Sequence, residues 1–249
     1  MEILTRRGFF ALVGTAGTLS CLGRGSPASA AEDTRLQARP APPTMSIVPG
    51  RRQLGLGGDR DGLLYIPSSY RPRTPIPLVV MLHGASRNGQ AMEYTFSLAE
   101  ELGVIVVAPD SRGRTWDVIL VDFGPDVRFI DAALKYVFAR CTVDPKRLVL
   151  GGFSDGASYA LSLGLANGDL FSHLVAFSPG FIATAPRHGK PRIFMSHGTE
   201  DAVLPIGSTS RRVAPSLTAV GYDVTYHEFN GPHTVPPPIA REAFGWLTK

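Results

Sequence analysis

A serine between two glycines stands near the middle of the chain. Residues 152–156 read Gly-Phe-Ser-Asp-Gly, after an apolar run at residues 147–151 and before a predicted helix at about 154–166. A serine on a sharp turn between a strand and a helix exposes its hydroxyl, and flanking glycines relieve the crowding there. The alternative is a glycine-rich helix cap with Ser154 as the N-cap residue. We favour Ser154 as a nucleophile.

A nucleophilic serine needs a base, and the base needs a carboxylate to orient it. Where the serine lies on a turn between a strand and a helix, the order along the chain is serine, acid, histidine. Asp201 lies in the loop after the predicted strand at residues 192–196, and Glu200 beside it is the alternative acid. His197 ends that strand and is expected to be structural. Asp201 is the predicted acid of the catalytic triad.

The base is expected after the last predicted strand. Residues 223–229 form that strand, and His233 lies in the loop that follows. His227 lies inside the strand, where a packed or edge-exposed position is expected. The predicted catalytic residues are therefore Ser154, Asp201 and His233.

The loop at residues 83–86 reads His-Gly-Ala-Ser and follows a buried apolar run at residues 77–82. A developing oxyanion takes backbone N–H groups from such a loop and from the residue after the nucleophile. The expected donors are Ala85 and Asp155, with Ser86 as the alternative to Ala85.

Predicted strands and helices alternate through the chain. This alternation predicts an α/β fold with a mostly parallel, doubly wound sheet, helices on both faces and the active site at the carboxyl ends of the strands. The predicted strands are residues 62–66, 77–82, 103–108, 147–151, 173–177, 192–196 and 223–229, and the predicted helices are residues 90–102, 127–141, 154–166, 206–219 and 236–247.

The first 30 residues are typical of an export signal. Arg6 and Arg7 precede an apolar run at residues 9–22, which is shorter than the roughly 20 residues that span a bilayer. Small residues at 28–30 suit cleavage before Ala31. These features predict export by the twin-arginine (Tat) machinery to the periplasm or the medium. The alternative is a lipoprotein anchored through Cys21.

The remaining chain divides into two parts. Residues 31–58 are rich in proline and glycine and predict a linker or loosely held arm, and residues 59–249 form the predicted catalytic domain. The net charge of +4 is spread over scattered residues, so nucleic-acid binding is not expected, and the short apolar run at residues 9–22 does not predict a stable membrane span.

From about residue 61 to its end, the chain resembles the small α/β-hydrolase esterases. It is most similar to the carboxylesterase/phospholipase branch, which neighbours polyhydroxybutyrate depolymerases and feruloyl esterases. The matching stretches are residues 82–84, 108–113, 115–117, 152–156, 197–201 and 231–233. The resemblance implies a serine carboxylic-ester hydrolase that forms an acyl-enzyme on Ser154. A small-molecule ester is the implied substrate, and neither a metal nor an organic cofactor is expected.

The resemblance also implies a substrate pocket. Residues 110–117 border the site in these enzymes, so Trp116 is expected to line the pocket, with a packed loop anchor as the alternative. His83 and Ser86 are expected to contact the substrate as well. Residues 180–190 lie where related enzymes insert a cap and are too short for a helical lid. An open site for short or soluble acyl groups is expected.

Other activities stay open on the same residues. Thioester, peptide or polyester cleavage would use the same triad, and a catalytically silent binding protein of this fold is a further alternative. A polyester is less favoured, because relatives that depolymerise polyesters often hold cysteine pairs and the predicted mature chain has Cys141 alone.

Overall fold

The computed structural model describes residues 34–247. One eight-stranded sheet runs through this part of the chain in the order β1-β2-β4-β3-β5-β6-β7-β8. The strands β1 and β2 are antiparallel to their neighbours, and the pairs from β4 to β8 are parallel. The strands are β1 (Gly50–Gln53), β2 (Gly62–Ile66), β3 (Ile76–Leu82), β4 (Ile105–Pro109), β5 (Val143–Phe153), β6 (His173–Phe177), β7 (Arg192–Gly198) and β8 (Val224–Phe229). The prediction of a mostly parallel, doubly wound sheet is confirmed.

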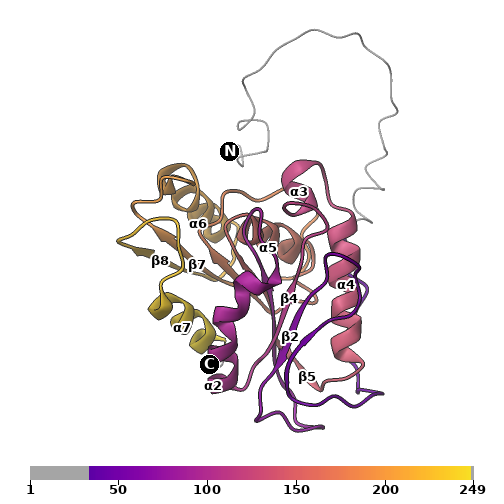
Figure 1. Ribbon diagram of the computed structural model, residues 1–249. Helices are drawn as coiled ribbons and strands as arrows, with labels where there is room; N and C mark the ends of the chain where they lie inside the picture. Colours follow the sequence, from indigo (N-terminus) through magenta and orange to yellow (C-terminus); the bar gives the residue numbers. More distant parts are fainter. Residues whose placement is uncertain (1–33, 248–249) are drawn as a thin grey trace, which may run out of the picture.

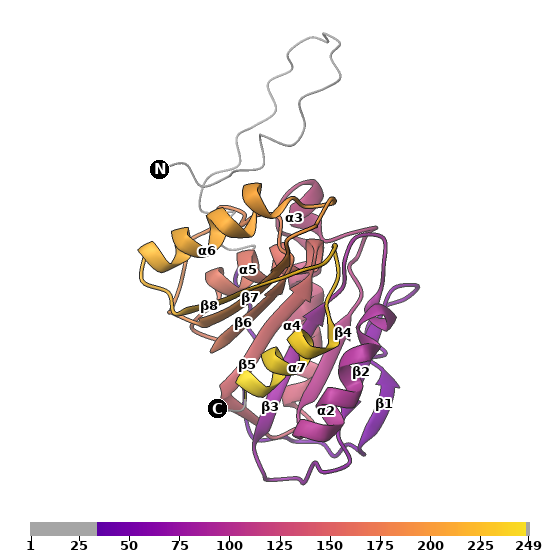
Figure 2. The same ribbon diagram turned by 90° about the vertical axis from the view of Figure 1, so that its left-hand side faces the viewer.

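Helices cover both faces of this sheet (Figure 1). One face carries α3 (Asp117–Leu120), α4 (Pro125–Phe138), α5 (Asp155–Ala166) and α6 (Ser210–Ala219), and the other carries α2 (Phe96–Leu102) and α7 (Pro237–Trp246). Figure 2 shows α2 and α7 lying in front of the strands. The short 3₁₀ helices η2 (Gly89–Thr95) and η3 (Ile206–Ser208) precede α2 and α6.

The central strands are mostly apolar where both of their faces are covered. Successive side chains of a strand point to opposite faces. In β5, Leu148 and Leu150 therefore pack with α4 and α5, while Val149 between them packs with α2 and α7. Continuous apolar runs are typical of such parallel strands.

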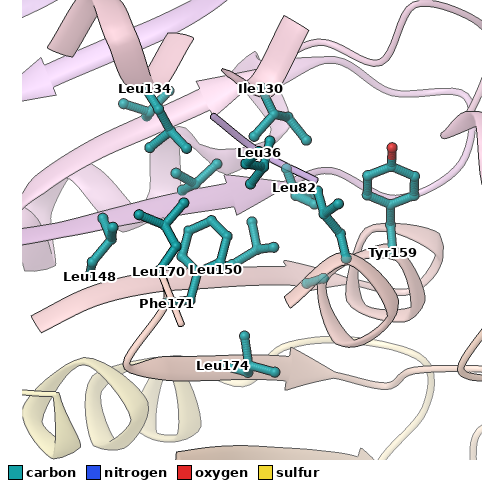
Figure 3. Close-up of a cluster of buried hydrophobic side chains, with 14 of the residues drawn as sticks. Leu36, Leu82, Ile130, Leu134, Leu148, Leu150, Tyr159, Leu170, Phe171 and Leu174 are labelled. Atoms are coloured by element: carbon teal, nitrogen blue, oxygen red, sulfur yellow. The ribbon is translucent and has the colours of Figure 1, made fainter. Parts of the chain in front are cut away.

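Residues 34–53, which precede β2, are held against the rest of the domain. Leu36 is 1% exposed and lies among side chains of α4 and β5, as Figure 3 shows. Its backbone N–H donates to the side-chain oxygen of Asn167 at 2.9 Å, and the N–H of Ala38 donates to Asp131 at 2.7 Å. Farther along, β1 joins the edge of the sheet. Over residues 34–58 this differs from the loosely held arm that the composition predicts, because side chains distant in sequence satisfy the backbone.

The predicted export signal at residues 1–30, with Cys21, lies outside the described residues. Within residues 34–247, no helix is both long enough and apolar enough to cross a membrane. The start of the catalytic domain at residue 59 stays a prediction.

Candidate active site

Ser154 lies on a strained turn between β5 and α5. Its backbone angles are φ 57° and ψ −120°, a region that side-chain-bearing residues seldom adopt and that often marks a functional site. Glycine is required at positions 152 and 156 because backbone from the end of β3 passes very close to both. A Cβ on Gly152 would lie 2.8 Å from the carbonyl oxygen of Leu82, and one on Gly156 would lie 2.6 Å from that of His83. The predicted sharp turn is therefore present.

Ser154, His233 and Asp201 come together at the carboxyl ends of β5, β7 and β8. The Nε2 atom of His233 lies 2.8 Å from Ser154 Oγ, and its Nδ1 atom lies 2.6 Å from Asp201 Oδ2. Because an ionised carboxylate only accepts hydrogen bonds, Nδ1 carries the proton in the neutral ring. This leaves Nε2 free to accept the proton of the serine hydroxyl, which is the arrangement of a serine nucleophile and its base.

The carboxylate of Asp201 is fully buried. Burial by itself would raise its pKa, but the amide of Leu204 and the ring of His233 outweigh this effect, so the pKa lies below its usual value. The amides of Val203 and Leu204 donate to Oδ1 at 2.9 and 2.7 Å. Asp201 therefore stays ionised beside His233. Glu200, the alternative acid, has an exposed side chain.

The loop that carries His233 is pinned to the loop that carries Asp201. The backbone N–H of Thr199 donates to Phe229 at 2.8 Å, and that of Glu200 donates to Gly231 at 3.0 Å. The ring of Phe153 packs against the ring of His233, with 4.7 Å between their centroids. His227 lies within β8 as expected, and its ring is 3.3 Å from Glu242.

Two backbone N–H groups can face a developing oxyanion near Ser154. The N–H of Asp155 is the first of α5, and the first N–H groups of a helix have no acceptor inside that helix. The carbonyl of Gly84 accepts from the ring of His83 at 2.8 Å. A trans peptide is planar, so the N–H of Ala85 points away from that buried ring. The N–H of Ser86 already donates to Arg114 at 2.8 Å, which leaves Ala85 as the better donor of the two.

The structure differs from the sequence prediction for the substrate contacts of His83 and Trp116. Both residues are 0% exposed, and neither lines the cleft beside Ser154. The backbone N–H of Ser111 donates to His83 Nε2 at 3.0 Å, so the ring is neutral and donates from Nδ1 to Gly84. Burial lowers the pKa of His83 to about 4. His83 therefore orients the peptide of Ala85 instead of touching a substrate.

Trp116 adds a second support to the same loop. Its indole N–H donates to the carbonyl of His83 at 2.8 Å, and its ring packs 5.2 Å from that of Tyr159 in α5. The alternative interpretation of Trp116, a packed loop anchor, is the one the structure favours. Ser86 is exposed but does not line the cleft.

An open cleft of about 510 Å³ lies over Ser154, within the range of about 300–1,000 Å³ typical of small-molecule sites. Tyr94 in η2 is 41% exposed and gives the cleft an aromatic wall, while Arg87 adds a positive charge. Residues 178–191, between β6 and β7, form no helix above the site. The lining consists of Gly84, Ala85, Arg87, Ala91, Met92, Tyr94, Phe153, Ser154, Val203, His233, Thr234 and Val235.

Sequence reasoning missed most of this lining. Phe153 could have been found, because it immediately precedes the nucleophile on the strained turn. Tyr94 carries no such local signal, since its place in the cleft depends on how η2 packs across the ends of β3 and β4.

A second hollow of about 330 Å³ lies beside β1 and β2. Its charged lining residues are Asp59, Asp61 and Asp110, and no serine, cysteine or histidine lines it. The carboxylates of Asp61 and Asp110 accept backbone N–H groups of neighbouring loops. This hollow therefore offers no serine or cysteine nucleophile and no histidine base, and the chemistry points to the cleft over Ser154.

Comparison with known proteins finds similarity to esterases in part of the chain. The phospholipase/carboxylesterase family matches residues 127–240. A probable feruloyl esterase C of Aspergillus oryzae is 30% identical over 156 residues, which are 59% of this chain and 57% of that protein. The matched part is thus less than two thirds of that relative's length.

Solved structures share the fold at low sequence identity. A ferulic acid esterase from Anaeromyces mucronatus, in complex with ferulic acid, has a TM-score of 0.63 and 19% identity, covering 82% of this chain and 91% of its own. Esterase PE8 has a TM-score of 0.59 and 22% identity, with 77% and 99% covered. An acetyl xylan esterase from Aspergillus awamori has a TM-score of 0.61 and 17% identity, with 80% and 99% covered. The chain has the α/β-hydrolase fold.

Proposed function

We propose that this protein hydrolyses small carboxylic esters through an acyl-enzyme on Ser154. The observation that carries the proposal is the hydrogen-bonded series from Asp201 through His233 to Ser154, with distances of 2.6 and 2.8 Å, beneath an open cleft. The similarity to feruloyl esterases supports the same reaction class.

Acylation begins when Ser154 Oγ attacks the ester carbonyl carbon and its proton passes to His233 Nε2. The carbonyl oxygen becomes an oxyanion, which the N–H groups of Ala85 and Asp155 stabilise. When the carbon–oxygen bond to the alcohol breaks, His233 returns the proton to the departing oxygen. Asp201 keeps the imidazole in the required tautomer and stabilises its charged form.

Deacylation repeats these steps with water as the nucleophile. A water molecule that gives a proton to His233 Nε2 attacks the acyl carbon, and the bond to Ser154 Oγ breaks as the proton returns to that oxygen. The carboxylic acid then leaves through the cleft. The serine is restored, so the cycle consumes only ester and water.

The lining of the cleft favours esters of compact or aromatic acids. Flat rings pack well against aromatic side chains, and Tyr94 and Phe153 offer two such surfaces near Ser154. A long acyl chain would extend beyond the cleft into water, since residues 178–191 form no helix to cover it. We propose short aliphatic and hydroxycinnamoyl-type acyl groups as the preferred class.

The test is hydrolysis of p-nitrophenyl acetate, butyrate and palmitate and of methyl ferulate. The unaltered chain is compared with Ser154→Ala and with Ser69→Ala. Ser69 is exposed and follows the end of β2 that lies away from the site, so it is a matched control for the loss of a serine hydroxyl. We expect kcat to fall by at least about a thousandfold in Ser154→Ala and to be unchanged in Ser69→Ala.

Two results would contradict this proposal. Full turnover by Ser154→Ala would show that another group performs the chemistry. A clear preference for palmitate, increasing above the concentration at which the substrate forms an emulsion, would show that the cleft accepts long lipid chains.

We further propose that the chain is exported by the Tat machinery. Arg6, Arg7 and the apolar run that follows them support this proposal. Mass spectrometry of the protein from the cell envelope or medium should find an N-terminus at Ala31, and replacement of both arginines by lysine should keep the protein in the cytoplasm. A lipid-modified Cys21 at the N-terminus would instead establish the lipoprotein alternative.

A further inference from the structure

A second histidine lies behind the acid of the triad. His197 is the penultimate residue of β7, and its side chain is 0% exposed. Its Nδ1 atom is 2.7 Å from the hydroxyl of Ser210, the first residue of α6. Its Nε2 atom is 2.8 Å from the carbonyl oxygen of Leu204 and 3.0 Å from Asp201 Oδ2. His197 therefore links helix α6 to the acid loop.

These neighbours determine where the proton of His197 resides. Leu204 and Asp201 present only acceptor atoms to Nε2, so Nε2 must carry a proton. The hydroxyl of Ser210 can donate to Nδ1, which satisfies the other nitrogen. Burial lowers the pKa of His197, so the ring is neutral at pH 7. The Nε2–H therefore donates to the carbonyl of Leu204 at 2.8 Å and lies beside Asp201 Oδ2, with 3.0 Å between the nitrogen and that oxygen.

The same carboxylate oxygen faces both histidines. Asp201 Oδ2 lies 2.6 Å from His233 Nδ1 on one side and 3.0 Å from His197 Nε2 on the other. A carboxylate removed from water stays ionised only when donors replace the lost hydration. The two amides on Oδ1 and the ring of His233 on Oδ2 supply these donors, and the N–H of His197 adds a positive dipole end 3.0 Å from Oδ2.

We propose that His197 is a positioning residue for the acid of the triad: its Nε2–H holds the acid loop through the carbonyl of Leu204 and lies beside Asp201 Oδ2, where it helps to keep this carboxylate ionised. This inference rests on the proposed function, because the state of Asp201 affects activity only if His233 and Ser154 perform the chemistry. His197 does not line the cleft, so it acts on the reaction through Asp201 and not through the substrate.

The other charged groups near His197 are already compensated. Glu228 is its partner on β8, and the carboxylate of Glu228 pairs with Arg211 of α6 at 2.7 Å. Asp201 and His233 are the titratable groups that face the ring from the loops. Removing the ring of His197 is thus expected to act mainly on Asp201.

The test compares His197→Leu, His197→Gln and His173→Leu. Leucine removes the donor while keeping an apolar filling, whereas glutamine keeps an N–H donor at a similar distance from the backbone. His173 is the matched control. It is also a buried strand histidine, but it lies at the amino-terminal end of β6, whereas the site lies at the carboxyl ends of the strands. Circular dichroism and urea unfolding show which variants are folded.

The readouts are kcat and KM for p-nitrophenyl acetate from pH 5 to 9, and the rate of Ser154 labelling by a fluorophosphonate. For His197→Leu we expect kcat and the labelling rate to fall about 10- to 100-fold, as for loss of a hydrogen bond to a charged group, with KM little changed. Without this dipole the negative charge of Asp201 is less compensated and the coupled Asp201–His233 pair takes up a proton more readily, so the acidic limb of the pH–rate profile should move to higher pH by about half a unit or more. His197→Gln should recover most of both effects.

Several results would overturn the inference. One is a folded His197→Leu variant that keeps the wild-type kcat and acidic limb. Another is a folded His197→Gln variant that is as impaired as His197→Leu. A third is an acidic limb that moves as far in His173→Leu as in His197→Leu. If His197→Leu does not fold, Ser210→Ala is used, since it frees Nδ1 and should move the acidic limb in the same direction by less. An unmoved limb in Ser210→Ala would then refute the role. Activity that survives Ser154→Ala would instead refute the proposed function itself.

Discussion

Acidification should show how much the buried ring of His83 contributes to stability. The pKa of this histidine is 6.5 in an unfolded chain and about 4 in the folded protein, because burial disfavours the charged ring. Between these values the unfolded chain binds a proton that the native protein does not. The contribution of the neutral His83 ring to the free energy of unfolding is therefore complete above pH 6.5, and it is lost as the pH falls from 6.5 to 4. The difference corresponds to about 3 kcal/mol of unfolding free energy.

An opposing group hides this effect in the unaltered protein. Burial raises the pKa of Asp126 from 3.8 to about 6, so the folded protein binds that proton first as the pH falls. Asp126 thus favours folding increasingly as the pH falls from 6 to 3.8, by a similar amount of about 3 kcal/mol. The pH dependence of the wild type alone cannot isolate His83, and a variant is needed.

The assay is urea unfolding of the wild type and His83→Gln at pH 7, 5.5 and 4. Glutamine can still accept from the backbone of Ser111 but does not titrate. We expect the variant to be less stable at pH 7 and the gap to narrow by up to about 3 kcal/mol at pH 4. Trp116→Phe is the matched control, since it disturbs the same loop without removing a titratable group. A gap for His83→Gln that stays constant with pH would refute the reasoning.

Three further predictions concern the turn, the arm and the cleft. Gly156→Ala should destabilise the protein by about 2 kcal/mol or more and reduce kcat, because the added Cβ would overlap the backbone at the end of β3. Gly245→Ala is the control, because a Cβ there would meet nothing within 4 Å. Thermal unfolding tests this, and equal melting temperatures for the two variants would contradict it. Asn167→Ala should cost about 2 kcal/mol and speed proteolysis near residues 34–38, because its buried amide binds the backbone there; unchanged cleavage would contradict this. Tyr94→Ala should raise KM for methyl ferulate by about fivefold more than for p-nitrophenyl acetate, and an equal change for both substrates would contradict the aromatic wall.

Local pattern and order along the chain were enough to predict the fold class and the three residues that meet at the site. The apolar runs have the length and continuity of strands covered on both faces, and each is bounded by turn residues. Ser154, Asp201 and His233 each follow such a run. Because the carboxyl ends of parallel strands share one edge of a sheet, these three residues had to lie near one another once the sheet formed.

Tertiary packing decided which side chains face the cleft and which face the core. His83 and Trp116 lie in loops at the expected edge, yet both turn inward to hydrogen-bond the backbone and pack against each other, while Tyr94 lines the cleft from η2. The residues around Leu36 likewise read as loose, but Asn167 and Asp131 satisfy their backbone from more than 90 positions away. The direction of a side chain at a loop and the partner of an irregular backbone depend on neighbours distant in sequence, so no local spacing records them.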